Sequence, residues 1–300
     1  MISAGYRPLA TACVALSWSA APLGELSARP SQPATAYVYE YLTGYPTTVE
    51  GEMHQLTYRL IIRAFRLLFV LLGLRIDLQG GEHLPTSGPA IVACNHIGFL
   101  DFALVGLAAD RRHRRVRFMA KASTFDNPLS GPLMRAMGHI PVDRMCGMPA
   151  ARRARDELRR GELVGIFPEA TISRAWMLKT FKRGAATLGV LEQVPVVPVV
   201  VWGVQRVLTV DGHWSLRRGK AITILIGEPI SPAATSDVTD FGDHLRTRMQ
   251  DLLERAQRGY PDLPRDEADR WWLPAHLGGS APTPVVAAEL DAAALRTSAR

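Results

Sequence analysis

After Gly88 the chain alternates short apolar runs with stretches of helical period, and this alternation limits the fold more than any other feature. Strands separated by helices are typical of an α/β domain with a largely parallel sheet. The expected strands are Ala90–Cys94, Val116–Ala120, Ile140–Val142, Val164–Phe167, Val196–Trp202 and Ala221–Ile226. The expected helices are Asp101–Ala109, Pro132–Met137, Pro149–Arg160, Gly184–Glu192 and Asp237–Gln257. We therefore predict a single α/β domain with a mainly parallel central sheet.

The charge balance predicts an anionic partner. The formal net charge is +7, which draws a chain to nucleic acid, an anionic lipid surface or a phosphorylated substrate. The sequence has no recognisable nucleic-acid-binding motif, and it lacks a Gly-x-Ser-x-Gly elbow, a P-loop and a dinucleotide-binding glycine fingerprint. Its three cysteines have no regular spacing, which argues against a disulfide framework or a structural zinc site and favours a reducing cytosol.

A helix is expected before the first strand, over Gln55–Leu74. Its apolar residues are interrupted by Arg59, Arg63 and Arg66 at steps of four and three residues, which gives a basic stripe on an apolar helix. The uninterrupted apolar run, Leu67–Leu74, is too short for a membrane span of about 20 residues. We favour a helix lying in the interface of an anionic membrane. The alternative is a core helix whose arginines extend to solvent.

These patterns divide the chain into four parts. Residues 1–52 are expected to be a flexible extension, and residues 53–80 contain the membrane-interface helix. Residues 81–262 form the α/β domain, and residues 263–300 form a mostly disordered tail. The tail contains an aromatic pair, Trp271 and Trp272, which could dock on the domain or on a membrane.

The turn after Ala90–Cys94 carries a candidate catalytic pair. His96 follows the strand and Asp101 stands at a helix start, so the carboxylate can fold back to one imidazole nitrogen. That bond would leave the other nitrogen as an oriented proton acceptor. The alternative is a buried histidine satisfied by a helix-capping aspartate. A nucleophilic Cys94 beside His96 is less favoured than a small buried strand residue, and His96, Asp101 and His139 lack a recognisable metal-ligand spacing.

Polar residues also follow later strands. Arg144 ends the stretch Gly138–Arg144, and Glu169 lies in the stretch Phe167–Arg174. Val194–Val200 is a β-branched run with prolines near its start. Ligands of open parallel sheets bind beyond the carboxyl ends of the strands, so His96, Arg144 and Glu169 are expected around one cleft.

These blocks together resemble the 1-acylglycerol-3-phosphate acyltransferase family. His96 and Asp101, separated by four residues, match its catalytic motif, and Asn95 also fits. Gly138–Arg144 and Phe167–Ser173 are similar to its glycerol-phosphate-binding blocks, and Val194–Val200 is similar to its fourth block. The resemblance covers residues 82–229 and implies a glycerolipid-acyltransferase-like fold. It implies that His96 and Asp101 are catalytic.

The substrate-binding residues that the resemblance implies are Lys121, Arg144, Glu169, Thr171, Arg174 and Lys182. The third block departs from the family pattern, because Ala170 and Ile172 stand where the family usually has Gly and Arg. Loss of that arginine removes one expected phosphate contact. Arg174, Lys179 or Lys182 could supply the charge instead.

The resemblance implies transfer of a fatty acyl group to the free hydroxyl of lysophosphatidic acid, giving phosphatidic acid in phospholipid biosynthesis. The donor would be acyl-CoA or an acyl carrier protein, and no cofactor or metal is implied. The expected location is the cytoplasmic face of the plasma membrane, peripheral or monotopic. Two alternatives stay open: an acyltransferase for another glycerol-phosphate, lysophospholipid or glycolipid acceptor, and a non-catalytic basic protein that binds membranes.

Overall fold

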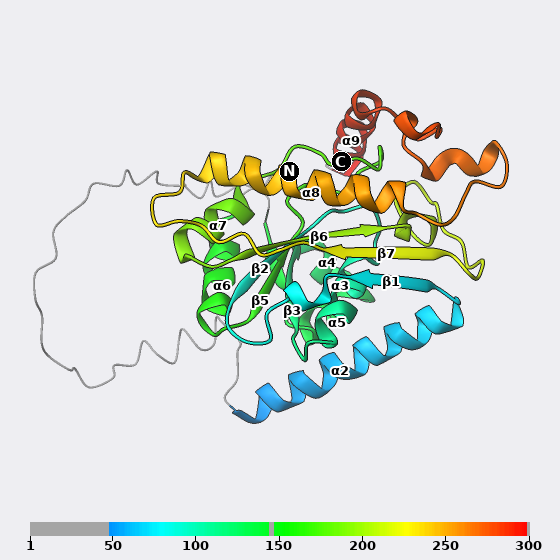
Figure 1. The fold of residues 1–300 in the computed structure, drawn as a ribbon. Coiled ribbons are helices and arrows are strands. Elements are labelled where there is room, and N and C mark those ends of the chain that lie inside the picture. Colours follow the sequence, from blue (N-terminus) through cyan, green and yellow to red (C-terminus); the bar gives the residue numbers. More distant parts are fainter. Residues whose placement is uncertain (1–47, 144–146, 299–300) are drawn as a thin grey trace, which may run out of the picture. The chain divides into compact units, whose positions relative to one another are not determined.

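The computed structural model of the chain describes residues 48–143 and 147–298 (Figure 1). Most of the expected flexible extension, 1–52, therefore lies outside the described residues, and so does Arg144. None of the helices in the described part of the chain is long and apolar enough to cross a membrane.

Within the described residues, seven strands form one sheet in the order β1-β7-β6-β2-β5-β3-β4. The strands are β1 (Arg75–Gln79), β2 (Ala90–Cys94), β3 (Val116–Lys121), β4 (Ile140–Val142), β5 (Leu163–Ile166), β6 (Val196–Trp202) and β7 (Ala221–Ile226). The pairs between β6, β2, β5, β3 and β4 are parallel, whereas β7 runs antiparallel to β6. The predicted α/β fold with a mainly parallel sheet is confirmed.

Helices cover both faces of the sheet (Figure 1). The α-helices are α2 (Thr48–Leu71), α3 (Asp101–Asp110), α4 (Ala122–Asp126), α5 (Ser130–Ala136), α6 (Met148–Arg159), α7 (Gly184–Glu192), α8 (Val238–Arg258) and α9 (Pro284–Ser298). Short 3-10 segments are η1 (Gly81–His83), η2 (Val204–Arg206), η3 (Ala268–Trp272) and η4 (Ala275–Leu277). Helices α6, α7 and α8 lie against one face, and α3 lies against the other with α2 packed on it, while α5 contacts α4 and α2.

The central strands are buried on both sides, as expected for a parallel sheet between two helical layers. Every residue of β2, β5 and β6 is buried, and so is every residue of β7. Since β2, β3, β4, β5 and β6 run in the same direction, their carboxyl ends meet at one edge of the sheet, which we call the carboxyl edge. The residues that follow these strands are therefore brought together there.

Helix α2 buries one face and exposes the other. Its buried side chains include Tyr58, Ile62 and Phe69, and the hydroxyl of Tyr58 accepts the backbone N–H of Val116 at 3.3 Å. Large apolar side chains on the rest of the helix are exposed: Leu56, Leu60, Leu67, Leu68, Val70 and Leu71. At about 100° per residue, these exposed side chains fall within an arc of about 160° on the side of the helix away from the buried face. The helix thus packs on the domain and also presents an apolar surface.

Two regions differ from the sequence-based expectations. Strand β1 was not expected, although Ile76 and Leu78 alternate with more exposed residues in the manner of an edge strand. The tail was expected to be mostly disordered, whereas the structure has two 3-10 segments and α9 there. In the first of these segments Trp272 is buried, and the guanidinium of Arg206 lies 4.4 Å from the centre of its ring. The aromatic pair docks on the domain.

Candidate active site

The turn after β2 brings His96 and Asp101 together. Nδ1 of His96 lies 2.8 Å from Oδ2 of Asp101, which is the contact expected from their spacing. The same Oδ2 accepts the backbone N–H groups of Ile97 and Gly98, each at 2.9 Å. Because a carboxylate oxygen can only accept, Nδ1 carries the proton and Nε2 is the free acceptor of the ring. The side chain of His96 is 21% exposed and that of Asp101 is fully buried.

The loop after β6 supports this turn. Its Leu208 carbonyl accepts the backbone N–H of Phe99 at 3.1 Å, and the hydroxyl of Thr209 donates to the carbonyl of Ile97 at 2.7 Å. A β-carbon at Gly98 would lie 3.0 Å from that Leu208 oxygen, so glycine lets the loop approach the turn without displacement. The His96 turn is therefore held from the β6 side.

Glu169 supports the turn from the β5 side. Its Oε1 accepts the backbone N–H of His96 and its Oε2 accepts that of Lys179, both at 2.9 Å. The carbonyl of His96 in turn accepts the N–H of Ser173 at 2.8 Å. Burial raises the pKa of the Glu169 carboxyl to about 7, against the lowering effect of the two N–H donors. Both carboxylate oxygens are thus used inside the protein.

Aromatic and amide side chains fix the ring and its strand. The ring of His96 stacks on that of Phe167, with 4.1 Å between ring centres, and Phe167 stacks on Phe118 at 5.1 Å. The amide of Asn95 donates to the carbonyl of Val201 at 3.0 Å and accepts the N–H of the same residue at 2.7 Å. Asn95 therefore continues the β2–β6 pairing up to the catalytic candidate.

Lys121 and Lys182, two of the other predicted phosphate ligands, lie on the opposite side of His96 from β6. Lys121 is exposed at the end of β3 and stands in register with Val142 of β4. Strand β5 separates β3 from β2, so Lys121 lies two strands away from His96 at the carboxyl edge. Arg144 follows β4 in the sequence but is outside the described residues. Lys182 is exposed, and its backbone N–H donates to the carbonyl of Pro168 at 2.8 Å.

Acidic side chains bind two cations, Arg174 and Lys179, that follow the third block, Phe167–Ser173. The guanidinium of Arg174 makes two hydrogen bonds to Asp211, at 2.8 and 3.0 Å, and also contacts Asp291 of α9. Nζ of Lys179 donates to the hydroxyl of Thr171 at 2.6 Å and also contacts Asp291. Asp291 was not expected from the sequence, because it lies more than 110 residues away in a tail expected to be disordered.

Cys94 and His139 have structural environments. Cys94 is fully buried, and this burial raises the pKa of its thiol well above the usual range, so the thiol stays protonated. Nδ1 of His139 accepts the backbone N–H of Phe118 at 3.0 Å, and burial lowers the pKa of His139 to about 3. Neither residue has the properties of a nucleophile or a general base at neutral pH.

Comparison with known proteins agrees with this geometry. Residues 75–202, from the start of β1 to the end of β6, match the family model described as Acyltransferase. The 1-acyl-sn-glycerol-3-phosphate acyltransferase of Bacillus subtilis is 31% identical over 169 residues, which cover 55% of this chain and 80% of the relative. The chain belongs to the 1-acyl-sn-glycerol-3-phosphate acyltransferase family.

The similarity extends to a plant member of this acyltransferase family and to a solved structure. The chloroplastic 1-acyl-sn-glycerol-3-phosphate acyltransferase of Brassica napus is 32% identical over 161 residues, or 52% of this chain and 45% of the relative. The chain thus spans about half the length of such chloroplast relatives. The crystal structure of the 1-acyl-sn-glycerophosphate acyltransferase PlsC from Thermotoga maritima has the same fold, with a TM-score of 0.60 and 21% identity over 76% of this chain and 91% of that one.

The two departures from the acyltransferase pattern occupy different environments. Ala170 has a φ of 61°, in the left-handed region that favours glycine, and its side chain is exposed. Ile172 is buried in the hydrophobic core. At the position where the family usually has an arginine, this chain therefore places an apolar side chain inside the protein, and no charge reaches the surface from there.

Proposed function

We propose that this acyltransferase-family chain transfers a fatty acyl group from a thioester to the free hydroxyl of 1-acylglycerol 3-phosphate, giving phosphatidic acid. The observation that carries the proposal is the pairing of Nδ1 of His96 with the buried carboxylate of Asp101. The relatives from Bacillus subtilis and Brassica napus carry this activity in their names. A fixed imidazole with one free nitrogen at a strand end is suited to activating a hydroxyl.

The reaction needs one proton acceptor and no covalent enzyme intermediate. Nε2 of His96 takes the proton of the acceptor hydroxyl as its oxygen attacks the thioester carbonyl. The ester C–O bond forms, the C–S bond breaks, and the departing thiolate takes the proton from the imidazolium. Asp101 stabilises the imidazolium and holds the tautomer. The backbone N–H groups of Ile97 and Gly98 are already bonded to Asp101, so they are unsuited to stabilise the oxyanion of the tetrahedral intermediate.

The acceptor phosphate is assigned to Lys121, the last residue of β3, and to Arg144, which comes two residues after β4 in the sequence. Thr171 and Lys182 lie in the segment that follows β5, and we assign them to the same side of the proposed site. Glu169 is best described as a positioning residue, because both of its oxygens bond to backbone N–H groups instead of facing a ligand. Holding the phosphate in this way would place the hydroxyl near His96.

A different acceptor is the second candidate function. Ile172 supplies no charge, and Arg174 and Lys179 are both bound by Asp291. The third block therefore offers less free positive charge than the family pattern implies. This favours testing acceptors whose phosphate is a diester, such as another lysophospholipid, or a glycolipid without phosphate.

An anionic membrane surface is the proposed partner of α2. Its exposed leucines lie on the face opposite the packed side chains, and Arg59, Arg63 and Arg66 are exposed on the same helix. This arrangement suits a helix lying in a membrane interface. We assign the protein to the cytoplasmic face of the plasma membrane, peripheral or monotopic, where lysophospholipid acceptors would be available.

The membrane proposal is tested by vesicle binding. Leu60 and Leu67 are 61% and 60% exposed, so Leu60→Gln/Leu67→Gln should leave the melting temperature unchanged. Each leucine contributes roughly 1.5–3 kcal/mol when it is buried, so binding to vesicles containing phosphatidylglycerol should weaken at least about tenfold. Leu129→Gln, on an exposed leucine outside α2, is the control and should bind like the wild type. Equal binding by all three proteins would contradict the proposal.

The enzymatic proposal is tested by acyl transfer in detergent. Labelled acyl-CoA or acyl carrier protein is the donor, and lysophosphatidic acid, glycerol 3-phosphate and lysophosphatidylglycerol are the acceptors. His96→Ala should lower the rate by about 10³-fold or more while leaving thermal stability nearly unchanged. A rate that survives in His96→Ala would overturn the assigned base. Absence of transfer with every donor and acceptor, with vesicle binding retained, would favour the non-catalytic alternative.

A further inference from the structure

A basic pocket lies beside the candidate active site, in a part of the chain to which the family resemblance assigned no role. It has a volume of about 560 Å³ and is formed by the end of the β6–β7 loop and by residues 261–272. Its charged lining consists of Arg206, Arg217, Arg218, Lys220, Arg265, Asp262 and Asp269. Five cations thus face two carboxylates, which leaves the pocket with a net positive charge. A cavity of this size can hold a small ligand.

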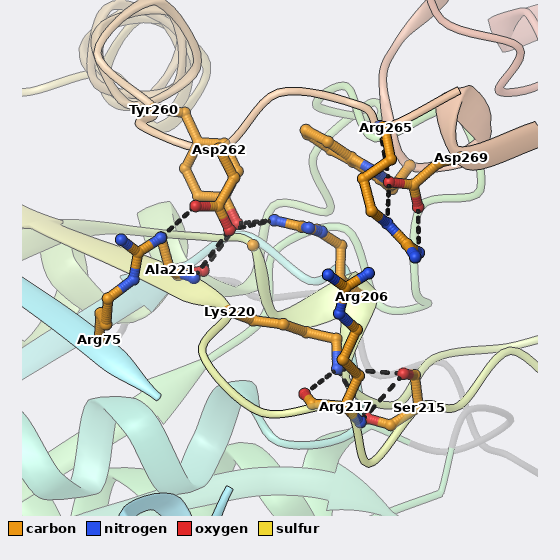
Figure 2. A network of polar contacts seen from close by, with 12 residues as sticks. Arg75, Arg206, Ser215, Arg217, Lys220, Ala221, Tyr260, Asp262, Arg265 and Asp269 are labelled. Carbon is orange, nitrogen blue, oxygen red and sulfur yellow. Dashed lines mark hydrogen bonds and ion pairs between the residues drawn. The ribbon is translucent and has the colours of Figure 1, made fainter. Parts of the chain in front are cut away.

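Ion pairs use only part of this charge. Asp262 pairs with Arg75 and Arg206, and Asp269 pairs with Arg265. Figure 2 shows these two carboxylates on the upper side of the network, with the Lys220 ammonium below them. In the described residues, Arg217, Arg218 and Lys220 form no salt bridge with a carboxylate. Arg217 and Arg218 can therefore bind an anion from outside directly, whereas Lys220, whose three N–H groups already bond to Ser215 and Arg217, adds only its positive charge.

Lys220 shows that the pocket is a formed structure and not a loose group of surface arginines. It is only 7% exposed, and its ammonium donates to the carbonyl of Ser215, to the Ser215 hydroxyl and to the carbonyl of Arg217, at 2.9, 3.1 and 2.6 Å (Figure 2). These bonds fix the loop that presents Arg217 and Arg218. Burial, with Arg206 and Arg217 nearby, lowers the pKa of Lys220 to about 8. An anion nearby would relieve this repulsion.

Aromatic rings line the same pocket. Trp271 stacks on His213 with 4.3 Å between ring centres, and Trp272 lies beneath the guanidinium of Arg206. Trp214 also lines the pocket but is 66% exposed, so its ring face is open to a ligand. Free cations beside an open indole are suited to a ligand that carries both phosphates and a planar base.

The pocket and His96 share the carboxyl edge of the sheet. Trp202, the last residue of β6, pairs with Thr223, so the antiparallel β7 begins at the edge where β6 ends. Lys220, just before β7, therefore lies at this edge. The loop between the two strands contacts the His96 turn through Leu208 and Thr209 before it reaches the pocket. Lys121 lies on the other side of His96, toward β3.

We propose that this pocket binds the phosphorylated adenosine end of a CoA thioester donor. The proposal rests on the proposed acyltransferase function and assigns the two substrates to opposite sides of His96. The diphosphate and 3′-phosphate of CoA match the two arginines without a carboxylate partner, Arg217 and Arg218, in a pocket whose charge Lys220 makes more positive, and adenine matches the open indole of Trp214. The long pantetheine arm of CoA separates its phosphates from its thioester and can extend along the carboxyl edge. The donor of this enzyme is accordingly a CoA thioester.

The test uses the full chain with both arginines neutralised, as Arg217→Gln/Arg218→Gln. Both side chains are exposed, so the variant should fold. Loss of two charge-assisted contacts should raise the KM for acyl-CoA at least about tenfold, with little change in the KM for the acceptor. Wild-type enzyme should show a similar increase with an acyl-dephospho-CoA donor, which lacks the 3′-phosphate. The matched control is Arg246→Gln/Arg248→Gln on α8, where two exposed arginines are changed outside this pocket.

Direct binding separates failure of this proposal from failure of the proposed function. Calorimetric titration with adenosine 3′,5′-bisphosphate should show binding to the wild type and the control and at least tenfold weaker binding to the pocket variant, whether or not turnover is measured. Active enzyme with an unchanged KM for acyl-CoA in the pocket variant would overturn the donor site and leave the acyltransferase function standing. If Arg217→Gln/Arg218→Gln lost binding to phosphatidic acid vesicles while its nucleotide binding was unchanged, the donor site would be overturned in favour of a lipid head-group site.

Discussion

Glu169 accepts the backbone N–H of His96 at 2.9 Å, so a carboxylate at the end of β5 fixes the residue that follows the neighbouring strand β2. Its second oxygen accepts the N–H of Lys179, and the side chain is buried. The carboxylate thereby ties two loops together at the carboxyl edge. Its protonation state is linked to the stability of the fold, because burial raises its pKa to about 7.

Glu169 should make stability depend on pH. Below pH 4.5 the carboxyl is protonated in both the folded and unfolded states, and between pH 4.5 and about 7 only the folded state keeps the proton. The free energy of unfolding should therefore fall as pH rises, by about 3 kcal/mol in total at pH 8 for the shift from 4.5 to about 7. Denaturant unfolding of wild type and Glu169→Gln at several pH values measures this. Since glutamine does not titrate, the free energy of unfolding of the wild type should fall by about 3 kcal/mol relative to that of Glu169→Gln between about pH 4 and pH 8, and a difference independent of pH would contradict the assignment.

Asp101→Asn should impair catalysis more than folding. The amide is nearly isosteric and its oxygen can still accept the N–H groups of Ile97 and Gly98, but it cannot stabilise an imidazolium by charge. We expect kcat to fall by about 10²–10⁴-fold with little change in either KM. Residues that act as a unit are not additive, so His96→Ala/Asp101→Asn should be no slower than His96→Ala alone. A further loss in the double variant would show that Asp101 acts independently of His96.

Ala170→Gly should stabilise the protein. The φ of 61° at Ala170 is unfavourable for a residue with a β-carbon, by roughly 1–2 kcal/mol, and glycine removes this at some cost in unfolded-state entropy. We expect a net gain of about 0.5–1 kcal/mol and a melting temperature higher by about 2–4 °C. Ala151→Gly within α6 is the matched control and should be destabilising. A lower melting temperature for Ala170→Gly would mean that the alanine side chain makes a favourable contact.

The sequence predicted those elements whose pattern is local. Strand β6 and helix α7 have the predicted bounds, and β2 is bounded by Pro89 and the His96 turn as expected. The antiparallel direction of β7 could not be predicted, because it depends on pairing with distant strands and not on the apolar pattern of Ala221–Ile226. The alternation around Ile76 and Leu78 indicates strand β1. The strand was not predicted, because it is short and comes directly after α2.

The site was predictable only in part. The spacing of His96 and Asp101 was sufficient to predict their contact, because both lie on one turn. Glu169 was expected near them from the strand order, but its backbone partner Lys179 was not, since the link runs through main-chain N–H groups that carry no sequence signal. Asp291 was beyond prediction, because a tail rich in alanine gives no indication of what it packs against.

Helix α9 should influence the acceptor site through Asp291. Asp291 contacts both Arg174 and Lys179, and all three side chains are at least partly buried. Asp291→Asn should lower the free energy of unfolding by about 1–2 kcal/mol, because two cations lose a partner that is only partly exposed to solvent. The same change should strengthen binding of a phosphorylated acceptor, because Lys179 then keeps only Thr171 as its side-chain partner. We expect the KM for lysophosphatidic acid to fall about threefold to tenfold at low salt and the effect to vanish at high salt.

Asp156→Asn, on an exposed aspartate of α6, removes one negative charge away from the third block. It should change neither the free energy of unfolding nor the KM for lysophosphatidic acid. Asp211→Asn gives a second comparison, because it removes one of the two carboxylates that pair with Arg174 and leaves Lys179 paired with Asp291, so it should produce a smaller decrease in KM. If the KM for lysophosphatidic acid rises in Asp291→Asn while glycerol 3-phosphate is unaffected, α9 helps to form the acceptor site instead of limiting its charge. Because Ile172 removes the charge that the family places in this block, the electrostatics of the acceptor site would then depend on a helix of the tail.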